Sequence, residues 1–157
     1  MNELVERVAA ALKSRGEMLA TAESCTGGWV AMACTALAGS SDWFERGWVT
    51  YSNAAKQDSL GVREATIRRH GAVSEETARE MAAGALGHGR AQAALAVTGI
   101  AGPAGGTPAK PVGTVCFAWA HGSKMASETR RFDGDRESVR RQSVVRALEG
   151  MLEQLNK

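Results

Sequence analysis

The chain has 157 residues, of which 44% are apolar and 23% charged, proportions typical of one globular domain with a single core. Its 19 lysines and arginines nearly balance its 17 aspartates and glutamates, which excludes nucleic-acid binding through net charge and requires any anion site to be local. Three cysteines without metal-binding spacing (Cys25, Cys34 and Cys116) predict reduced thiols, and since no signal peptide or membrane span is expected, we expect a cytoplasmic protein.

Apolar residues in the first half of the chain follow two kinds of pattern. A spacing of three and four residues is typical of an amphipathic helix, and short apolar or alternating runs are typical of strands. Asparagine before the first pattern and glycine after it supply a cap and a stop. The expected elements are a helix between an N-cap at Asn2 and Gly16, a strand at residues 18–22, a helix at 26–37, a strand at 44–52 and a short helix at 53–60.

The second half begins with helical spacing and continues with strands. A capping pattern introduces each of its two long helices. The expected elements are a helix from a cap at Ser74 to about His88, a strand at 93–98, a glycine- and proline-rich run at 99–113, a hairpin of strands at 114–119 and 127–132 with a turn at 121–123, and a last helix capped by residues 133–135. This order predicts a single α/β domain over residues 1–157, in three layers, with a mixed and mostly parallel sheet covered by helices and an antiparallel hairpin at one side.

The turn between the first strand and the second helix carries the letters AESCTGGW, residues 22–29. Amides at a helix start attract negative charge, so a nucleophilic Ser24 there would lie beside an oxyanion hole. The candidate contacts follow the serine, where glycines let a ligand approach the backbone: Cys25, Thr26, Gly27 and Gly28. Taken alone, the pattern favours an ordinary N-cap at Ser24 or Thr26.

A serine nucleophile needs a base, and Lys56 can serve if burial keeps its amine neutral. Tyr51, the only tyrosine of the chain, can pass the proton between them. Taken singly, Lys56 is better interpreted as a solvated helix residue and Tyr51 as a core aromatic. Histidine offers no alternative base, because all three histidines fall at expected helix ends or turns: His70, His88 and His121.

The glycine-rich run leaves the carboxyl end of a central strand, which is where open α/β sheets bind ligands. It fits neither the P-loop pattern nor the dinucleotide fingerprint. Its candidate phosphate or ribose contacts are Thr98, Gly99, Ile100, Ala101, Gly102, Gly105, Gly106 and Thr107. A plain surface loop is an equal alternative, and Lys110 just beyond it is either a ligand contact or a solvated side chain.

Two arginines, Arg136 and Arg140, lie four residues apart at the start of the last helix. Cations there oppose the helix dipole, so an anion is a plausible reason for them, and guanidinium binds phosphate with two hydrogen bonds. Pairing with Asp133 or Glu137 is the alternative for Arg136. Such pairing is favoured for Arg141.

Five motifs follow one another along nearly the whole chain: TAESCTGG, GWVTYSNAAKQDSLGV, GAVSEETA, ALAVTGIAGPAGGTPAKPVGTV and FDGDRESVR. Together they resemble the CinA C-terminal domain family, whose active members are nicotinamide-nucleotide amidohydrolases. The resemblance implies deamidation of nicotinamide mononucleotide to nicotinate mononucleotide and ammonia, a step of pyridine-nucleotide salvage. We expect a stand-alone member, without the second domain of longer relatives.

The resemblance also implies roles for the residues above. Ser24, Tyr51 and Lys56 occupy the family's catalytic positions, with the serine attacking the carboxamide carbon and the other two carrying protons. Amides near residues 25–27 would hold the oxyanion. The glycine loop and the arginine pair would hold the ribose phosphate, and neither a metal nor a cofactor is implied.

One departure from the family pattern is Ala104, which stands where the family usually reads glycine. If this position needs a positive φ, alanine would be strained there by about 1 kcal/mol or more.

Two other interpretations remain. Cys25 could be the nucleophile, because a thiol at a helix N-terminus has a lowered pKa. Alternatively, the chain is a catalytically silent relative that binds a nucleotide or a partner protein in competence or DNA-damage processes. The expected partner is a small nucleotide, and neither nucleic acid nor a membrane is expected. We also expect a homo-oligomer, with a dimer favoured. Tryptophans 29, 43 and 48 hint at a buried interface or a pocket wall, and core packing is an equal alternative.

Overall fold

The computed structural model describes residues 1–157. It contains six α-helices, one short 3-10 helix and five strands. In chain order these are α1 (Asn2–Arg15), β1 (Leu19–Glu23), α2 (Trp29–Thr35), η1 (Ser40–Asp42), β2 (Phe44–Val49), α3 (Asn53–Leu60), α4 (Glu64–His70), α5 (Glu75–His88), β3 (Ala93–Gly99), β4 (Thr114–His121), β5 (Lys124–Arg131) and α6 (Arg136–Leu155).

The strands form one sheet in the order β2-β1-β3-β4-β5. Strand β1 pairs in parallel with β2 and β3, whereas β4 pairs antiparallel with β3 and β5. Only β4 therefore runs against the others, and the predicted mixed, mostly parallel sheet with a hairpin at one side is confirmed.

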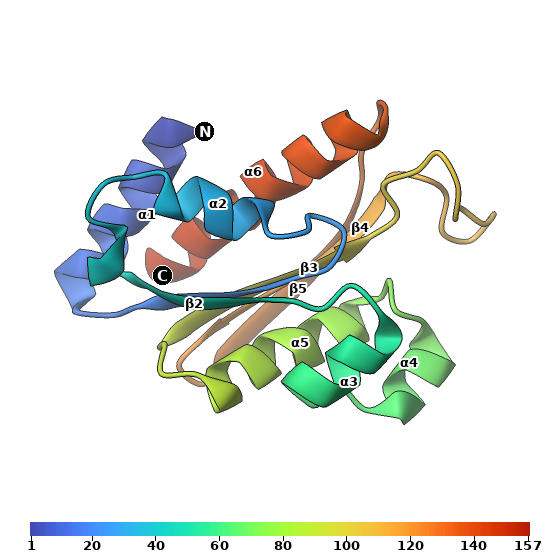
Figure 1. Ribbon diagram of the computed structural model, residues 1–157, viewed down its shortest axis with the longest axis horizontal. Coiled ribbons are helices and arrows are strands. Elements are labelled where there is room, and N and C mark those ends of the chain that lie inside the picture. Colours follow the sequence, from blue (N-terminus) through green and yellow to red (C-terminus); the bar gives the residue numbers. More distant parts are fainter.

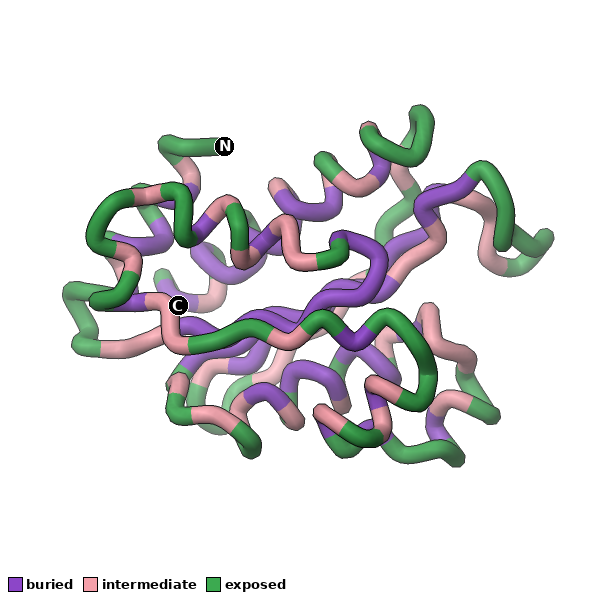
Figure 2. Tube along the Cα trace, in the orientation of Figure 1, coloured by how far each residue is buried: buried purple, intermediate pink, exposed green.

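Helices cover both faces of this sheet, with α1, α2 and α6 on one face and α3, α4 and α5 on the other (Figure 1). Strands β1 and β3 are almost entirely buried, as expected of parallel strands covered on both sides. Two apolar clusters result, one beneath α1 and α6 and one beneath α5. Figure 2 shows the burial concentrated along the central strands and the exposure along the outer helix faces and loops.

Local signals placed most helix ends, with two differences. The Ser74 side chain accepts from the Thr77 amide and the Asp135 side chain from the Ser138 amide, so both predicted caps are confirmed. Asn2 is instead the first residue of α1 and caps nothing, because the helix begins one residue earlier than predicted.

The second difference is the start of α2, which begins at Trp29 rather than near residue 26. Gly27 and Gly28 have φ values of 59° and 101°, in the left-handed region that glycine adopts without steric cost. Residues 24–28 are therefore a tight turn, and both glycines are required by the backbone before any ligand is considered.

The carboxyl ends of β1, β2 and β3 meet at one edge of the sheet because the three strands are parallel. The predicted serine turn, the segment carrying Lys56 and the glycine-rich run all leave from this edge, which is where ligands bind in such sheets. None of the helices combines the length and the apolar character needed to cross a bilayer.

Candidate active site

Ser24 and Lys56 meet at this edge of the sheet. Their Oγ and Nζ atoms lie 3.0 Å apart, although the residues are 32 positions apart in the chain. Ser24 follows β1 directly, and Lys56 lies in the first half of α3. Both are buried, at 7% and 1% exposure, so the predicted nucleophile and base form a pair shielded from water.

The buried position of Lys56 shifts its amine toward the neutral form. Burial lowers the pKa of its amine, partly opposed by the neighbouring Cys25. Its Nζ also lies 2.8 Å from the Thr50 carbonyl oxygen and 3.2 Å from that of Tyr51. In the structure Nζ donates to Ser24 Oγ and to both carbonyls. Once it loses a proton, the amine has two N–H groups and one lone pair, so it can keep both carbonyl contacts and accept the Ser24 proton. The interpretation of Lys56 as a solvated helix residue is wrong.

Tyr51 contributes differently from what the sequence predicted. Its side chain is on the surface, with 61% of the residue exposed, so the core interpretation is wrong. The hydroxyl accepts from Nη2 of Arg136 at 3.3 Å and makes no hydrogen bond to Ser24 or Lys56. It is the Tyr51 backbone carbonyl that contacts Lys56, because the side chain points out of the buried turn.

Cys25 lies beside Ser24 but is a poor nucleophile. Burial above all, together with the nearby Glu23 carboxylate, raises the pKa of its thiol to about 12. The thiolate, which is the reactive form, is therefore scarce at neutral pH. A helix N-terminus would have lowered this pKa, but α2 begins four residues later.

Glu23, the last residue of β1, is a site residue that the sequence reasoning missed. Its carboxylate is 1% exposed and accepts from the Thr26 hydroxyl at 2.7 Å and from the amides of Gly28, Val30 and Ala31 at 3.2, 2.9 and 3.0 Å. Glu23 thus caps α2, and the interpretation of Ser24 or Thr26 as an ordinary N-cap is wrong. The available signal was an acidic residue just before a helix start, which complements the helix dipole.

The turn has two amides beside Ser24 that remain free. The Ser24 amide donates to the Val97 carbonyl and the Gly27 amide to the Ser24 carbonyl, whereas the amides of Cys25 and Thr26 donate to no other residue. Backbone N–H groups without a partner next to a nucleophile are the usual material of an oxyanion hole.

A pocket of about 170 Å³ opens beside the Ser24–Lys56 pair. This volume suits one six-membered aromatic ring, since a cavity of about 150 Å³ holds benzene. Its walls come from the end of β3, from the segments that follow the three parallel strands, from α3, from the loop between α4 and α5, and from α6: Ser24, Cys25, Tyr51, Lys56, Ala72, Val73, Thr98, Gly99, Ala101 and Arg136. An open hollow of about 320 Å³ lies on the other side of the turn, against Thr26, Gly27, Gly28, Trp29, Met32 and Arg140.

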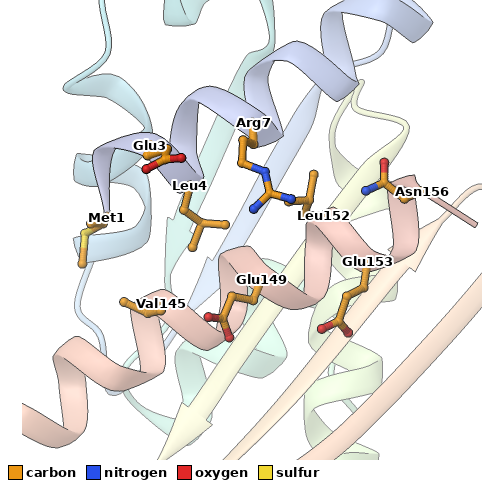
Figure 3. Close-up of a pocket in the computed structure, with 9 residues that line it drawn as sticks. All are labelled: Met1, Glu3, Leu4, Arg7, Val145, Glu149, Leu152, Glu153 and Asn156. Carbon is orange, nitrogen blue, oxygen red and sulfur yellow. The ribbon is translucent and has the colours of Figure 1, made fainter.

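A larger hollow of about 540 Å³ lies between α1 and α6. Figure 3 shows its charged side chains on both helices, Glu3 and Arg7 on α1 and Glu149 and Glu153 on α6. It contains neither serine nor lysine and shares no residue with the pocket beside Ser24. The smaller pocket is therefore the candidate active site.

Comparison with known families decides the relationship. The family model described as CinA C-terminal domain matches residues 1–155. The chain belongs to the CinA C-terminal domain family. It is 56% identical over 154 residues to nicotinamide-nucleotide amidohydrolase PncC of Escherichia coli strain K12, covering 97% of this chain and 93% of that protein.

Other members agree in sequence and in structure. Nicotinamide-nucleotide amidohydrolase PncC of Pseudomonas putida is 53% identical over 150 residues, covering 96% of this chain and 94% of the relative. The crystal structure of competence/damage inducible protein CihA from Agrobacterium tumefaciens superposes with a TM-score of 0.94 at 48% identity, covering 99% of this chain and 95% of that one.

In this CinA C-terminal domain the glycine-rich run divides into two parts. Thr98, Gly99 and Ala101 line the pocket. Ile100 is held between β4 and the end of the run by backbone bonds to Thr114 and Gly113. A side chain at Gly99 would lie 2.8 Å from Val115 and 3.1 Å from the Cys25 sulfur, so glycine permits the close approach of β3 to the serine turn.

The rest of the run, residues 103–109, is exposed and projects from the sheet (Figure 1). Its base is tied to α4 by the Lys110 Nζ, which donates to the His70 carbonyl at 2.6 Å. The structure does not bring Gly105, Gly106 or Thr107 to the pocket, and their role in binding stays a prediction. Ala104 is not strained, because no residue other than glycine has a positive φ.

The two predicted arginines make different contacts. Arg136 donates to the Gly102 carbonyl at 2.9 Å and to the Tyr51 hydroxyl, and it lines the pocket. Arg140 donates to the carbonyls of Cys25 and Thr26 at 3.0 and 3.2 Å. Neither forms an ion pair, whereas Arg141 pairs with Glu137 at 3.1 Å as favoured.

Other expected features lie away from the pocket of the CinA C-terminal domain. The three histidines contact Glu76, the Gly84 carbonyl and Glu17, respectively, so none is placed as a base. Trp43 is in the core at 1% exposure. The Trp29 ring lies under the guanidinium groups of Arg140 and Arg141, at 5.5 and 5.3 Å, and is thus part of the wall of the open hollow.

Proposed function

We propose that this CinA C-terminal domain hydrolyses the carboxamide of nicotinamide mononucleotide to nicotinate mononucleotide and ammonia, through an acyl-enzyme on Ser24. The observation that carries the proposal is the buried contact between Ser24 Oγ and Lys56 Nζ, 3.0 Å long. The relatives named as nicotinamide-nucleotide amidohydrolases, at 53% and 56% identity, support the substrate class.

The reaction begins when Ser24 Oγ attacks the carboxamide carbon and its proton passes to the neutral Lys56 amine. The carbonyl oxygen becomes negative and accepts from the free amides of Cys25 and Thr26. The C–N bond then breaks, the leaving nitrogen takes a proton from Lys56, and ammonia departs. Water attacks the resulting ester and gives one proton to Lys56, nicotinate mononucleotide leaves with a free carboxyl group, and Ser24 regains its proton from Lys56.

Tyr51 is the third member of the proposed catalytic set. It borders the pocket, and its exposed side chain can turn inward to relay the proton of Lys56 to the leaving nitrogen. Its hydroxyl is held by Arg136 at the pocket mouth, so substrate phosphate arriving at Arg136 would release the tyrosine.

The pocket holds the pyridine ring, which leaves the ribose and phosphate outside it. We place the phosphate at Arg136, which lines the pocket and has no carboxylate partner. Arg140 adds positive charge to the same end of α6. The exposed part of the glycine-rich run, including Gly105, Gly106 and Thr107, would cover the ribose.

Ammonia release from nicotinamide mononucleotide, followed by a coupled glutamate dehydrogenase assay, tests the proposal. A panel that adds nicotinamide riboside, nicotinamide and the dinucleotide identifies the preferred carboxamide. We expect the mononucleotide to be hydrolysed best, because only it combines a ring of the right size with a terminal phosphate. Tight binding of the mononucleotide without ammonia release over hours would refute hydrolysis and favour a silent binding protein.

The expected dimer remains a prediction. Three exposed apolar side chains, Met32, Val49 and Tyr51, lie on α2, at the end of the edge strand β2 and just after it. Light scattering after size exclusion measures the mass of the particle in solution and decides between one chain and two.

A further inference from the structure

The backbone of the serine turn is held from two sides by charged side chains that the proposed chemistry does not use. On one side Arg140 donates hydrogen bonds to two backbone carbonyls. Its Nε donates to the Cys25 carbonyl at 3.0 Å and its Nη2 to the Thr26 carbonyl at 3.2 Å. Its guanidinium also lies over the Trp29 ring. Two of its nitrogens are therefore already committed to the protein.

These carbonyl contacts determine where the amides point. In a trans peptide the C=O and N–H groups lie on opposite sides of the C–N bond. Because the Cys25 carbonyl faces Arg140, the Thr26 N–H faces away from Arg140. By the same reasoning the Ser24 carbonyl, which accepts from the Gly27 amide, turns the Cys25 N–H outward.

On the other side the Glu23 carboxylate accepts hydrogen bonds from residues 26–31 of the turn and of α2. Its Oε1 accepts from the Thr26 hydroxyl and the Gly28 and Val30 amides, and its Oε2 accepts from the Ala31 amide. These four hydrogen bonds satisfy a carboxylate that is buried away from water. The donors at the start of α2 are thus occupied, and no anion can compete for them.

We propose that Arg140 and Glu23 are positioning residues of the active site, which orient the serine turn so that the Cys25 and Thr26 amides alone are free to bind the oxyanion. The inference rests on the proposed amidase function and changes the predicted role of Arg140, from a phosphate ligand to a support of the nucleophile turn. Neither residue is assigned a contact with the substrate.

Arg140→Met tests the inference against the phosphate interpretation, with Arg141→Met as matched control. Arg141 is the next residue of α6, carries the same charge over the same ring, and makes no contact with the turn. Ammonia release is measured for nicotinamide mononucleotide and for nicotinamide riboside, which lacks the phosphate.

If Arg140 positions the turn, kcat falls about 100-fold for both substrates, as for displacements of catalytic groups by an ångström, and KM changes little. Arg141→Met keeps kcat within about twofold on the same reasoning. A raised KM confined to the mononucleotide would show that Arg140 binds phosphate and would overturn the inference, as would unchanged kinetics.

Glu23→Gln provides an independent arm. The glutamine carbonyl can keep the three contacts of Oε1, but its NH2 group faces the Ala31 amide, donor against donor. We expect kcat to fall at least about tenfold while KM stays close to wild type. Glu23→Asp, which restores both oxygens on a shorter side chain, recovers part of that loss. A Glu23→Gln enzyme that is folded by circular dichroism and fully active would refute the role of Glu23.

Pyridine-3-boronic acid separates a failure of this inference from a failure of the proposed function. Ser24 Oγ adds to the trigonal boron, its proton passes to Lys56, and the tetrahedral boron carries the negative charge that the two amides stabilise. Calorimetry should show binding to wild type, at least about tenfold weaker binding to Arg140→Met, and none to Ser24→Ala. A wild type that binds the boronic acid but releases no ammonia refutes the amidase alone. Equal binding by wild type and Arg140→Met refutes the positioning role alone. No binding by wild type refutes the Ser24 nucleophile, and with it both proposals.

Discussion

Replacing Ser24 and Cys25 separately by alanine distinguishes the two nucleophiles that the turn offers. Ser24→Ala removes the only hydroxyl in contact with Lys56, so ammonia release should fall by about 10⁶-fold, to the background, as in other hydrolases that lose their nucleophile. Cys25→Ala leaves the Ser24–Lys56 pair and both free amides in place. It should keep most of the activity.

The size of the expected contrast follows from the burial of Cys25. With a thiol pKa of about 12, about one molecule in 10⁴ carries a thiolate at pH 8. Lys56, by contrast, has a lowered pKa and shares a hydrogen bond with Ser24, so the serine is in contact with a base, whereas the thiol forms no hydrogen bond to one. Reaction through sulfur would therefore be limited by the scarcity of its reactive form.

Both variants are assayed with nicotinamide mononucleotide at one enzyme concentration, and their thermal unfolding is compared with that of wild type. Mass spectrometry of enzyme quenched during turnover locates the acyl group on residue 24 or 25. A folded Ser24→Ala protein with more than a tenth of wild-type activity, or an acyl group on Cys25, would refute the reasoning.

Further predictions concern the base, the phosphate contact and the glycine-rich run. For wild type, kcat/KM should rise with pH to a plateau with an apparent pKa below 10.5, the usual lysine value, because only the neutral amine accepts the serine proton; a flat profile in a stopped ammonia assay would contradict this. Lys56 binds a proton more readily in the unfolded chain than in the folded protein. The unfolding free energy from urea titrations should therefore rise with pH between the lowered pKa and 10.5, by about 1.4 kcal/mol for each pH unit in that window. Lys56→Met should remove that rise. Arg136→Met should raise KM for the mononucleotide about tenfold or more without affecting the riboside, measured by initial rates, and equal effects on both substrates would exclude a phosphate contact. Ala104→Gly should destabilise by up to about 1 kcal/mol through unfolded-chain entropy, since Ala104 has no positive φ; a gain in melting temperature would contradict this.

The parts of the fold that were predictable are those with local causes. Caps at Ser74 and Asp135 are formed by side chains three residues from their donors, and the buried strands β3 and β4 are mostly apolar. The start of α2 was misplaced because its cap, Glu23, reaches forward across a turn of left-handed glycines. Residue types alone do not reveal such a reach, since an acidic residue at the end of a buried strand is usually expected to face solvent.

The residues of the site were predictable as candidates, but their contacts depend on sheet pairing. Tyr51 and Lys56 are close in sequence, yet they meet through the Tyr51 backbone carbonyl, which faces the buried Lys56 Nζ. The Tyr51 hydroxyl lies at the surface and contacts Arg136. No periodicity distinguishes these two outcomes, because they differ only in the direction of one side chain at a strand end.

The Ser24–Lys56 contact is a consequence of the register between β1 and β2. Glu23 lies opposite Val49, so the residues that follow, Ser24 and Thr50, leave the sheet together, and the Thr50 amide donates to the Glu23 carbonyl. Lys56 lies one helical turn into α3, at the position where its side chain reaches Ser24. That register depends on close strand packing at Gly47, where a Cβ would lie 2.5 Å from the Thr21 hydroxyl. A glycine in an edge strand, remote from the pocket, is therefore part of what brings nucleophile and base together.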